Sequence, residues 1–402
     1  MYLVPIILWV LDPGYAEWDA YTVRMTHDVV LISTLTVFCA ISVTALGFYI
    51  GQNSKVKINF GKNLFSFESL RVFCLFYGFL YFTLYLVIIF LSGGIGDFIA
   101  QGIESRGGGS SLGLSGYIRY FLISGEVFIP YAILFAFKTR GYRLIKIIFF
   151  LLFLFAVFTV SISTGSRAAL IYPFMVLFFY WLLCSERLNV KLLLAGVFVF
   201  IVGLTSVNYA KVFLYGVPMP DHTFESFLNS AVSVTYHAFS YFKHYLITIA
   251  VVYSDPEVYE FPRAGLDYFR AFVEVLPGVG KHDVDFLGLT SIPAELNKEY
   301  LGGTGYVPPG WIAFALMNGG MIFLVIYGIF SSFLGGVVDR SLPVDSSNRG
   351  VAAAHKVLFF FAWFRIFYAQ DPWQVLLANF GIYLMILVWL FSFRVRFVFG
   401  KK

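Results

Sequence analysis

The chain has 402 residues, of which 59% are hydrophobic and 13% are charged. Soluble domains carry about 25% charged side chains, so this composition excludes an ordinary soluble enzyme or binding domain. The formal net charge is +5, but in an apolar chain the placement of Lys and Arg carries more information than their sum. We therefore predict an all-α polytopic membrane protein that has no nucleic-acid partner.

Apolar runs near the length that a helix needs to cross the hydrocarbon core, about 20 residues, recur along the whole chain. Eight runs are continuous: 29–51, 72–92, 117–137, 145–163, 168–184, 192–207, 311–333 and 373–393. Two further runs are weaker candidates, because 2–11 is short and 351–369 contains His355, Lys356 and Arg365. The sequence thus predicts about ten transmembrane helices. No basic segment or cleavage site precedes the first run, so we expect the chain to be inserted whole.

The distribution of charge between the predicted helices indicates their orientation. If the helices cross the membrane in alternation, one set of connections holds 17 of the 28 Lys and Arg residues and four acidic residues. The other set holds 11 basic residues and 19 of the 23 acidic ones. Because cytoplasmic loops are enriched in Lys and Arg, we predict that the first set, and with it both termini, is cytoplasmic.

One connection is much longer than the others. Residues 208–310 form about a hundred residues on the predicted outer side, whereas connections between helices usually have about two to eight. We therefore divide the chain into an N-terminal transmembrane bundle (1–207), a large outer loop with interfacial helices (208–310) and C-terminal transmembrane helices (311–402).

Two arginines in or beside apolar helices are candidates for binding an anion. Arg167 ends the turn 163–167, Ser-Thr-Gly-Ser-Arg, between two predicted helices. Such a turn brings a guanidinium and free helix amides together at headgroup level, which suits a pyrophosphate; the alternative is interfacial snorkelling. Arg365 lies in an apolar helix about two turns from its outer end, and burial requires a partner anion, either Asp371 or a bound lipid phosphate.

Further candidates lie in the second half of the long loop. Arg263 and Arg270 are seven residues apart, so on a helix they would share a face and could grip one anionic headgroup. His282 follows the turn-rich run 277–280 and could act as a general base that Asp283 orients. A solvated basic face and a surface histidine are the alternatives.

Glu126 is a carboxylate deep within the predicted helix 117–137. Arg119 comes seven residues earlier and is predicted to lie on the same face of that helix. A carboxylate at this depth could relay protons, but hydrogen bonding between helices is the preferred interpretation.

The three cysteines lie in apolar runs, at Cys39, Cys74 and Cys184. This placement predicts core packing, because it provides neither a disulfide framework nor the clustered spacing of a zinc site. We predict no metal and no cofactor.

Several segments taken in order resemble the bacterial O-antigen polymerases. They are the turn 163–167, the long outer loop, the segment 302–310 (Gly-Gly-Thr-Gly-Tyr-Val-Pro-Pro-Gly) and the 318–320 run Asn-Gly-Gly in the helix that follows. The resemblance covers residues 149–333, while the N-terminal third matches in topology only. Members of that family are polytopic glycosyltransferases that extend lipid-linked oligosaccharide repeat units.

The resemblance implies a GT-C-like fold in the bacterial inner membrane with an active site that faces the periplasm. It implies inverting transfer without a metal or a nucleotide sugar, in which Arg167 and either Arg263 or Arg270 contact the pyrophosphate of an undecaprenyl-linked glycan. The implied partners are undecaprenyl-pyrophosphate-linked glycans, the lipid bilayer and a chain-length regulator protein.

The chain departs from the family pattern in one stretch that bears on the catalytic base. Family members often carry an acidic residue where this chain has 311–314, Trp-Ile-Ala-Phe. The base therefore stays open among His282, Asp283 and Glu295, with Glu17, Asp19 and Asp28 in the first loop as outside candidates.

Two alternative functions can be compared with the polymerase interpretation. The related O-antigen ligases place a His-Asn pair just before the late helix, where this chain has Tyr306 and Val307, which argues against a ligase. A transporter or flippase is expected to have paired broken helices or a two-half repeat, and neither is evident in the sequence.

Overall fold

The computed structural model describes residues 27–56, 58–59, 62–104, 114–164, 167–185, 194, 243–254, 265–266, 310–342, 348–367, 379–393 and 398–399. The predicted spans 2–11 and 192–207 and most of the long loop lie outside these residues. The number of ten transmembrane helices and the three-part division of the chain therefore stay predictions.

Most of the described helices form one bundle around a shared apolar core. The long helices of this bundle are α3 (Phe67–Ser92), α7 (Arg143–Ser163), α8 (Arg167–Cys184), α15 (Arg349–Phe367) and α16 (Phe380–Ser392). A further member is the broken helix made of α5 (Leu114–Ile123), the 3-10 segment η3 (Ser124–Phe128) and α6 (Ile129–Lys138). Its short elements are η2 (Lys62–Phe65) and α4 (Ile95–Glu104).

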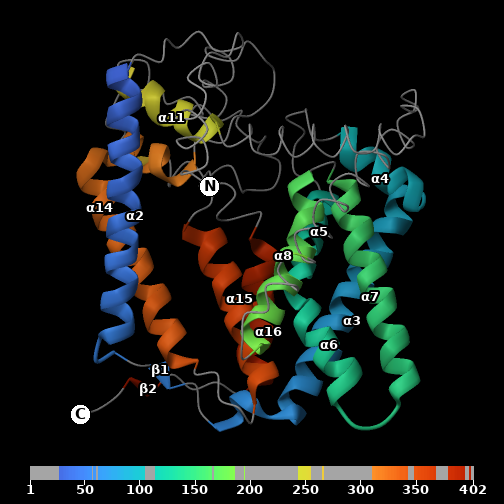
Figure 1. Ribbon diagram of the computed structural model, residues 1–402. Coiled ribbons are helices and arrows are strands. Elements are labelled where there is room, and N and C mark those ends of the chain that lie inside the picture. The colour runs from blue at the N-terminus through green and yellow to red at the C-terminus, as the bar shows by residue number, and fades with distance from the viewer. Residues whose placement is uncertain are drawn as a thin grey trace.

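A second group of helices packs around its own apolar cluster, at the left in Figure 1. It contains α2 (His27–Asn53), α11 (Lys243–Ser254) and α14 (Gly310–Ser341). The helices α2 and α14 run in parallel, because Gly47 faces Ile329 and Gly51 faces Phe333. A Cβ atom added at Gly51 would lie 2.2 Å from the Phe333 carbonyl oxygen, so glycine is what allows the two backbones to approach this closely.

The helix ends define two ends of the molecule, which we call upper and lower as in Figure 1. At the upper end α2, α5, α8 and α14 begin, and at the lower end the short strands β1 (Ile58–Asn59) and β2 (Val398–Phe399) pair in antiparallel fashion. This pairing brings the segment after α2 and the C-terminal segment to one end, as the charge pattern predicts.

The charge pattern also appears in where the basic residues lie along the helices. Most described Lys and Arg residues lie near the lower end: Lys55, Lys62, Arg71, Lys138, Arg140, Arg143, Lys146, Arg340, Arg349 and Lys356. One ion pair there links α14 to α15, with Lys356 Nζ 2.8 Å from Asp339 Oδ1. The lower end is thus the one that the positive-inside rule assigns to the cytoplasm.

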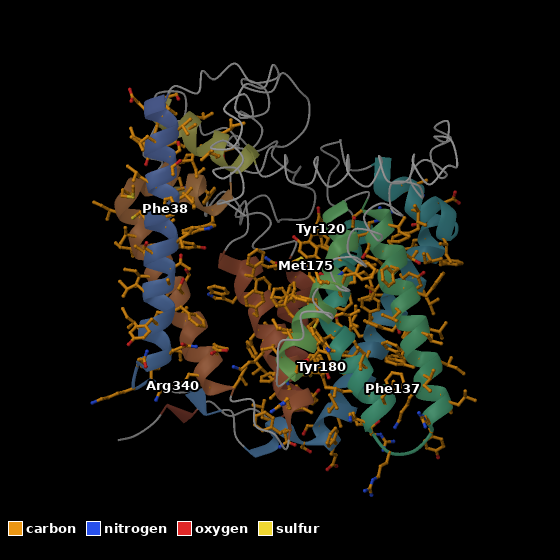
Figure 2. The ribbon with its side chains drawn as sticks, in the orientation of Figure 1. Phe38, Tyr120, Phe137, Met175, Tyr180 and Arg340 are labelled. Carbon is orange, nitrogen blue, oxygen red and sulfur yellow. The ribbon has the colours of Figure 1, made fainter. Side chains whose placement is uncertain are left out.

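Five helices are long and apolar enough to cross a membrane: Asp28–Asn53, Phe67–Ser92, Gly116–Lys138, Arg143–Ser163 and Gly310–Ser341. All five coincide with predicted spans. Their outward faces carry large apolar side chains, such as Phe90 with 85% exposed and Ile322 with 75% exposed, and Figure 2 shows such side chains projecting from the outer faces of α2 and α7. Contiguous apolar surface of this kind is suited to lipid rather than water, so these helices indicate a helical membrane protein.

Two of the helices that were predicted as continuous are interrupted. The predicted helix 117–137 changes to 3-10 geometry over Ser124–Phe128. In α14 the backbone leaves helical geometry at Gly319 and Gly320, where Gly320 has a φ of 65°. The first part of α14, from Gly310 to Asn318, is entirely buried, whereas the part beyond the break is long enough to span the membrane by itself, because it has about 21 residues.

Candidate functional site

A buried ion pair joins two helices in the upper half of the bundle. Arg365 of α15 donates from Nη2 to Oε1 of Glu126 in η3. Both side chains are enclosed, with 13% of Arg365 and 3% of Glu126 exposed. For Arg365 the sequence predicted Asp371 or a lipid phosphate as partner. The observed partner is Glu126, while Asp371 lies outside the described residues.

Local sequence explains why Glu126 is available to this arginine. Pro130 is the residue that would donate to the Glu126 carbonyl in a regular α-helix, but proline has no N–H. The Glu126 carbonyl instead accepts from the N–H of Ile129, three residues on, which is the 3-10 pattern. The change of pitch alters the direction in which Glu126 points. Glu126 is the only buried charged residue between 114 and 138, so this helix breaks where its buried charge lies.

The break is held by close contacts with two other helices. Gly125 leaves space for Tyr81 of α3, since a Cβ atom there would lie 2.5 Å from the tyrosine ring. The Tyr81 hydroxyl donates to the Leu122 carbonyl at 3.1 Å. On the other side Gly381 of α16 packs so tightly that an added Cβ atom would lie 2.3 Å from the Phe121 carbonyl oxygen. The position of Glu126 is therefore set by tertiary packing as well as by Pro130.

Aromatic and polar groups surround the Arg365 guanidinium. Its central carbon lies 5.1 Å from the centre of the Tyr172 ring of α8, a cation–π distance. The side chain of Asn379, just before α16, donates to the Arg365 carbonyl at 3.3 Å. The Tyr77 hydroxyl of α3 is also buried, and it has no hydrogen-bond partner among the described residues. The site is thus polar and enclosed, with one guanidinium at its centre.

Arg167 is the first residue of α8 and Tyr172 lies on the same helix. At 1.5 Å per residue, the start of α8 is about 7.5 Å along the helix axis from Tyr172. The structure therefore brings two predicted anion-binding positions, Arg167 and Arg365, to the same half of one bundle. The side chain of Arg167 lies outside what the structure describes.

Arg119 and Glu126 were predicted to share a helix face, and the structure gives them different partners. The α-helix that contains Arg119 ends at Ile123, and Glu126 lies in the 3-10 segment that follows. Arg119 instead donates from Nη2 to the Phe98 carbonyl at 3.3 Å, and its guanidinium carbon lies 4.8 Å from the centre of the Phe98 ring. It thus ties α4 to α5.

Five predicted site residues lie outside the described residues. They are Arg263, Arg270, His282, Asp283 and Glu295. In the first-loop group, Glu17 and Asp19 are also outside, while Asp28 is an exposed residue in the first turn of α2. The assignment of the catalytic base to one of these residues therefore stays a prediction.

His355, which interrupts the predicted span 351–369, is buried and has a structural role. His355 accepts at Nδ1 from Trp389 Nε1 at 3.0 Å and lies 2.8 Å from the Tyr131 hydroxyl. Because indole only donates, Nδ1 carries no proton, and Nε2 donates to the Leu64 carbonyl at 2.8 Å. This neutral ring joins α6, α15, α16 and η2.

The cysteines are free thiols, of which Cys74 is buried and the other two are partly buried. This agrees with the predicted role in core packing. Among the described residues no group of three or more His, Cys, Asp or Glu side chains could hold a metal ion.

Comparison with known proteins yields no relative. No protein-family model, no curated protein and no solved structure matches the chain. Its function is therefore inferred from its own residues.

Proposed function

We propose that this protein is a polysaccharide polymerase of the O-antigen type. It joins undecaprenyl-pyrophosphate-linked oligosaccharide repeat units at the periplasmic face of the bacterial inner membrane, by inverting glycosyl transfer without a metal. The growing chain on undecaprenyl pyrophosphate is the donor, and a hydroxyl of a newly arrived repeat unit is the acceptor. A chain-length regulator protein is the expected partner.

One observation carries the proposal. Arg167 begins α8 in the turn that resembles the polymerases, and Arg365 lies beside Tyr172 of the same helix. Two arginines in an apolar bundle require compensating negative charge. Glu126 supplies one such charge to Arg365, and a lipid-linked diphosphate would supply the rest. The N-terminus of α8, where Arg167 lies, adds partial positive charge that would favour a pyrophosphate.

The proposed chemistry assigns separate tasks to the arginines and the base. The acceptor hydroxyl attacks the anomeric carbon of the donor sugar, and the bond from that carbon to the pyrophosphate oxygen breaks. The acceptor proton passes to a base, for which His282, Asp283 and Glu295 are the candidates. The leaving pyrophosphate gains negative charge, which Arg167, Arg365 and one of the loop arginines, Arg263 or Arg270, would stabilise.

The direct test is elongation by the purified protein. The detergent-solubilised chain is incubated with an undecaprenyl-pyrophosphate-linked repeat unit and EDTA, and the products are separated by size. A ladder of multiples of the repeat unit is expected. Unextended substrate from the source strain, with protein that remains monodisperse, would contradict the polymerase proposal.

A lipid-linked-glycan transporter is the second candidate, and the interrupted helices favour it. Transporters use discontinuous helices to form sites within the membrane. The bundle has a break at Ser124–Phe128 beside a buried charge pair, and α14 of the second group has another at Gly319 and Gly320. In proteoliposomes a transporter would move a fluorescent lipid-linked glycan between leaflets without lengthening it, whereas a polymerase would lengthen it.

A further inference from the structure

The Glu126–Arg365 pair is asymmetric in its access to the surface. Arg365 retains 13% exposure, while Glu126 is 3% exposed and its Oε1 accepts from Arg365. A guanidinium has five N–H donors in a planar fork, and among the described residues one carboxylate oxygen occupies only part of that fork. The part of this pair that is left accessible therefore belongs to Arg365 rather than to Glu126.

The surroundings also restrict how Arg365 can present its donors. Tyr172 covers a face of the guanidinium at 5.1 Å, Glu126 occupies one edge, and Asn379 holds the Arg365 backbone at its carbonyl. What these contacts leave is an edge of the fork, which is the part that binds phosphate oxygens in bidentate fashion.

We propose that Glu126 and Tyr172 are positioning residues that orient Arg365 toward the diphosphate of a polyprenyl-linked substrate. The inference rests on the proposed function, because that function supplies the ligand class. Glu126 touches neither donor nor acceptor sugar in this assignment. It neutralises Arg365 inside the bundle and fixes which edge of the guanidinium faces the ligand.

The test measures binding as well as elongation. Farnesyl diphosphate serves as the probe and farnesyl monophosphate as its matched control, with affinity measured from the shift of thermal unfolding in detergent. Wild type should bind the diphosphate more tightly than the monophosphate. Glu126→Gln keeps the shape of the side chain and an acceptor oxygen but removes the charge. It should weaken diphosphate binding about tenfold, because a neutral acceptor holds the guanidinium in its orientation less firmly than a carboxylate does.

A second ion pair on the same helix provides the control. Lys356 and Asp339 form a pair at the lower end of α15, away from the proposed site. The double variant Asp339→Asn with Lys356→Met should bind the diphosphate like wild type. The double variant Glu126→Leu with Arg365→Met removes both buried charges, so it should fold but lose the preference for diphosphate over monophosphate.

The outcomes separate the two proposals. If wild type elongates but Glu126→Gln binds the diphosphate as tightly as wild type and keeps its KM, the positioning role is overturned while the polymerase proposal stands. If wild type prefers the diphosphate, and Glu126→Gln loses this preference, yet no ladder forms, the positioning role stands and the polymerase proposal fails. If wild type does not distinguish diphosphate from monophosphate, the ligand class assigned to Arg365 is wrong.

Discussion

At the scale of single residues, the decisive feature is a charge pair buried in an apolar bundle. Removing one member of a buried pair leaves an uncompensated charge, which costs about 3–5 kcal/mol, whereas replacing both members with apolar side chains is often neutral or stabilising. Glu126 and Arg365 are both enclosed, so single and double replacements of this pair should differ in stability in this way. A double variant that folds normally then shows which losses of function do not come from misfolding.

We predict that Glu126→Leu and Arg365→Met each lower the stability of the protein by about 3 kcal/mol, and that the double variant recovers most of this loss. Thermal unfolding of the three variants in one detergent measures it. Losses that simply add in the double variant would show that the two side chains do not interact.

Arg167 belongs to the same scale, because its expected role depends on one guanidinium at the start of α8. We predict that Arg167→Ala abolishes chain extension but leaves the protein in the membrane, since the residue is the first of α8 and the apolar remainder of the helix is unchanged. Polymer length on a gel, beside the amount of protein in the membrane fraction, measures the effect.

The matched control for Arg167→Ala is Arg143→Ala, which changes an exposed arginine at the lower end of α7. Normal polymer is expected from it. Near-normal polymer from Arg167→Ala would remove this residue from the site.

At the scale of elements, glycines decide which helices can approach each other. The pair α2 and α14 depends on Gly47, Gly51 and Gly336, where an added Cβ atom would lie within 2.5 Å of a carbonyl oxygen on the other helix. Backbone atoms cannot move aside as a flexible side chain can, so this interface should tolerate no side chain at these positions.

We predict that Gly51→Ala lowers stability by about 1–3 kcal/mol through overpacking. Gly96→Ala in α4 is the control, because an added Cβ atom meets nothing within 4 Å there. The midpoints of thermal unfolding are compared. Equal midpoints for both variants would mean that α2 and α14 do not pack in this way.

At the scale of the whole molecule, the two ends of the bundle differ in charge. The exposed residues Lys138, Arg140 and Arg143 cluster where α6 turns into α7, and β1 and β2 join the C-terminal segment to this same end. The positive-inside rule then predicts that the lower end is cytoplasmic.

This orientation can be tested by labelling in intact cells. In a background where Cys39, Cys74 and Cys184 are replaced by Ala, a cysteine at Arg140 should react with a membrane-impermeant maleimide only after lysis. A cysteine at Gly94, between α3 and α4 at the other end, should react in intact cells. The reverse pattern would place the proposed site on the cytoplasmic side.

Hydrophobic runs were sufficient to predict the class of protein and its five long apolar helices. Each of the five long apolar helices coincides with a run read from the sequence, because crossing the hydrocarbon core requires about 20 apolar residues in succession, and that requirement is local. The positions of Lys and Arg likewise indicated which loops lie at the same end of the molecule, because the positive-inside rule uses only the charges of each loop.

The partner of Arg365 was decided by the tertiary structure alone. Glu126 lies 239 residues earlier, and no local pattern relates the two positions. Pro130 signalled a disturbance of the helix, but the turn of Glu126 toward α15 also depends on Tyr81 and Gly381 from two other helices. Composition, spans and charge balance follow from neighbouring residues and were determined by the sequence itself, whereas the pairing of two buried charges follows from packing between distant helices and only the folded molecule decides it.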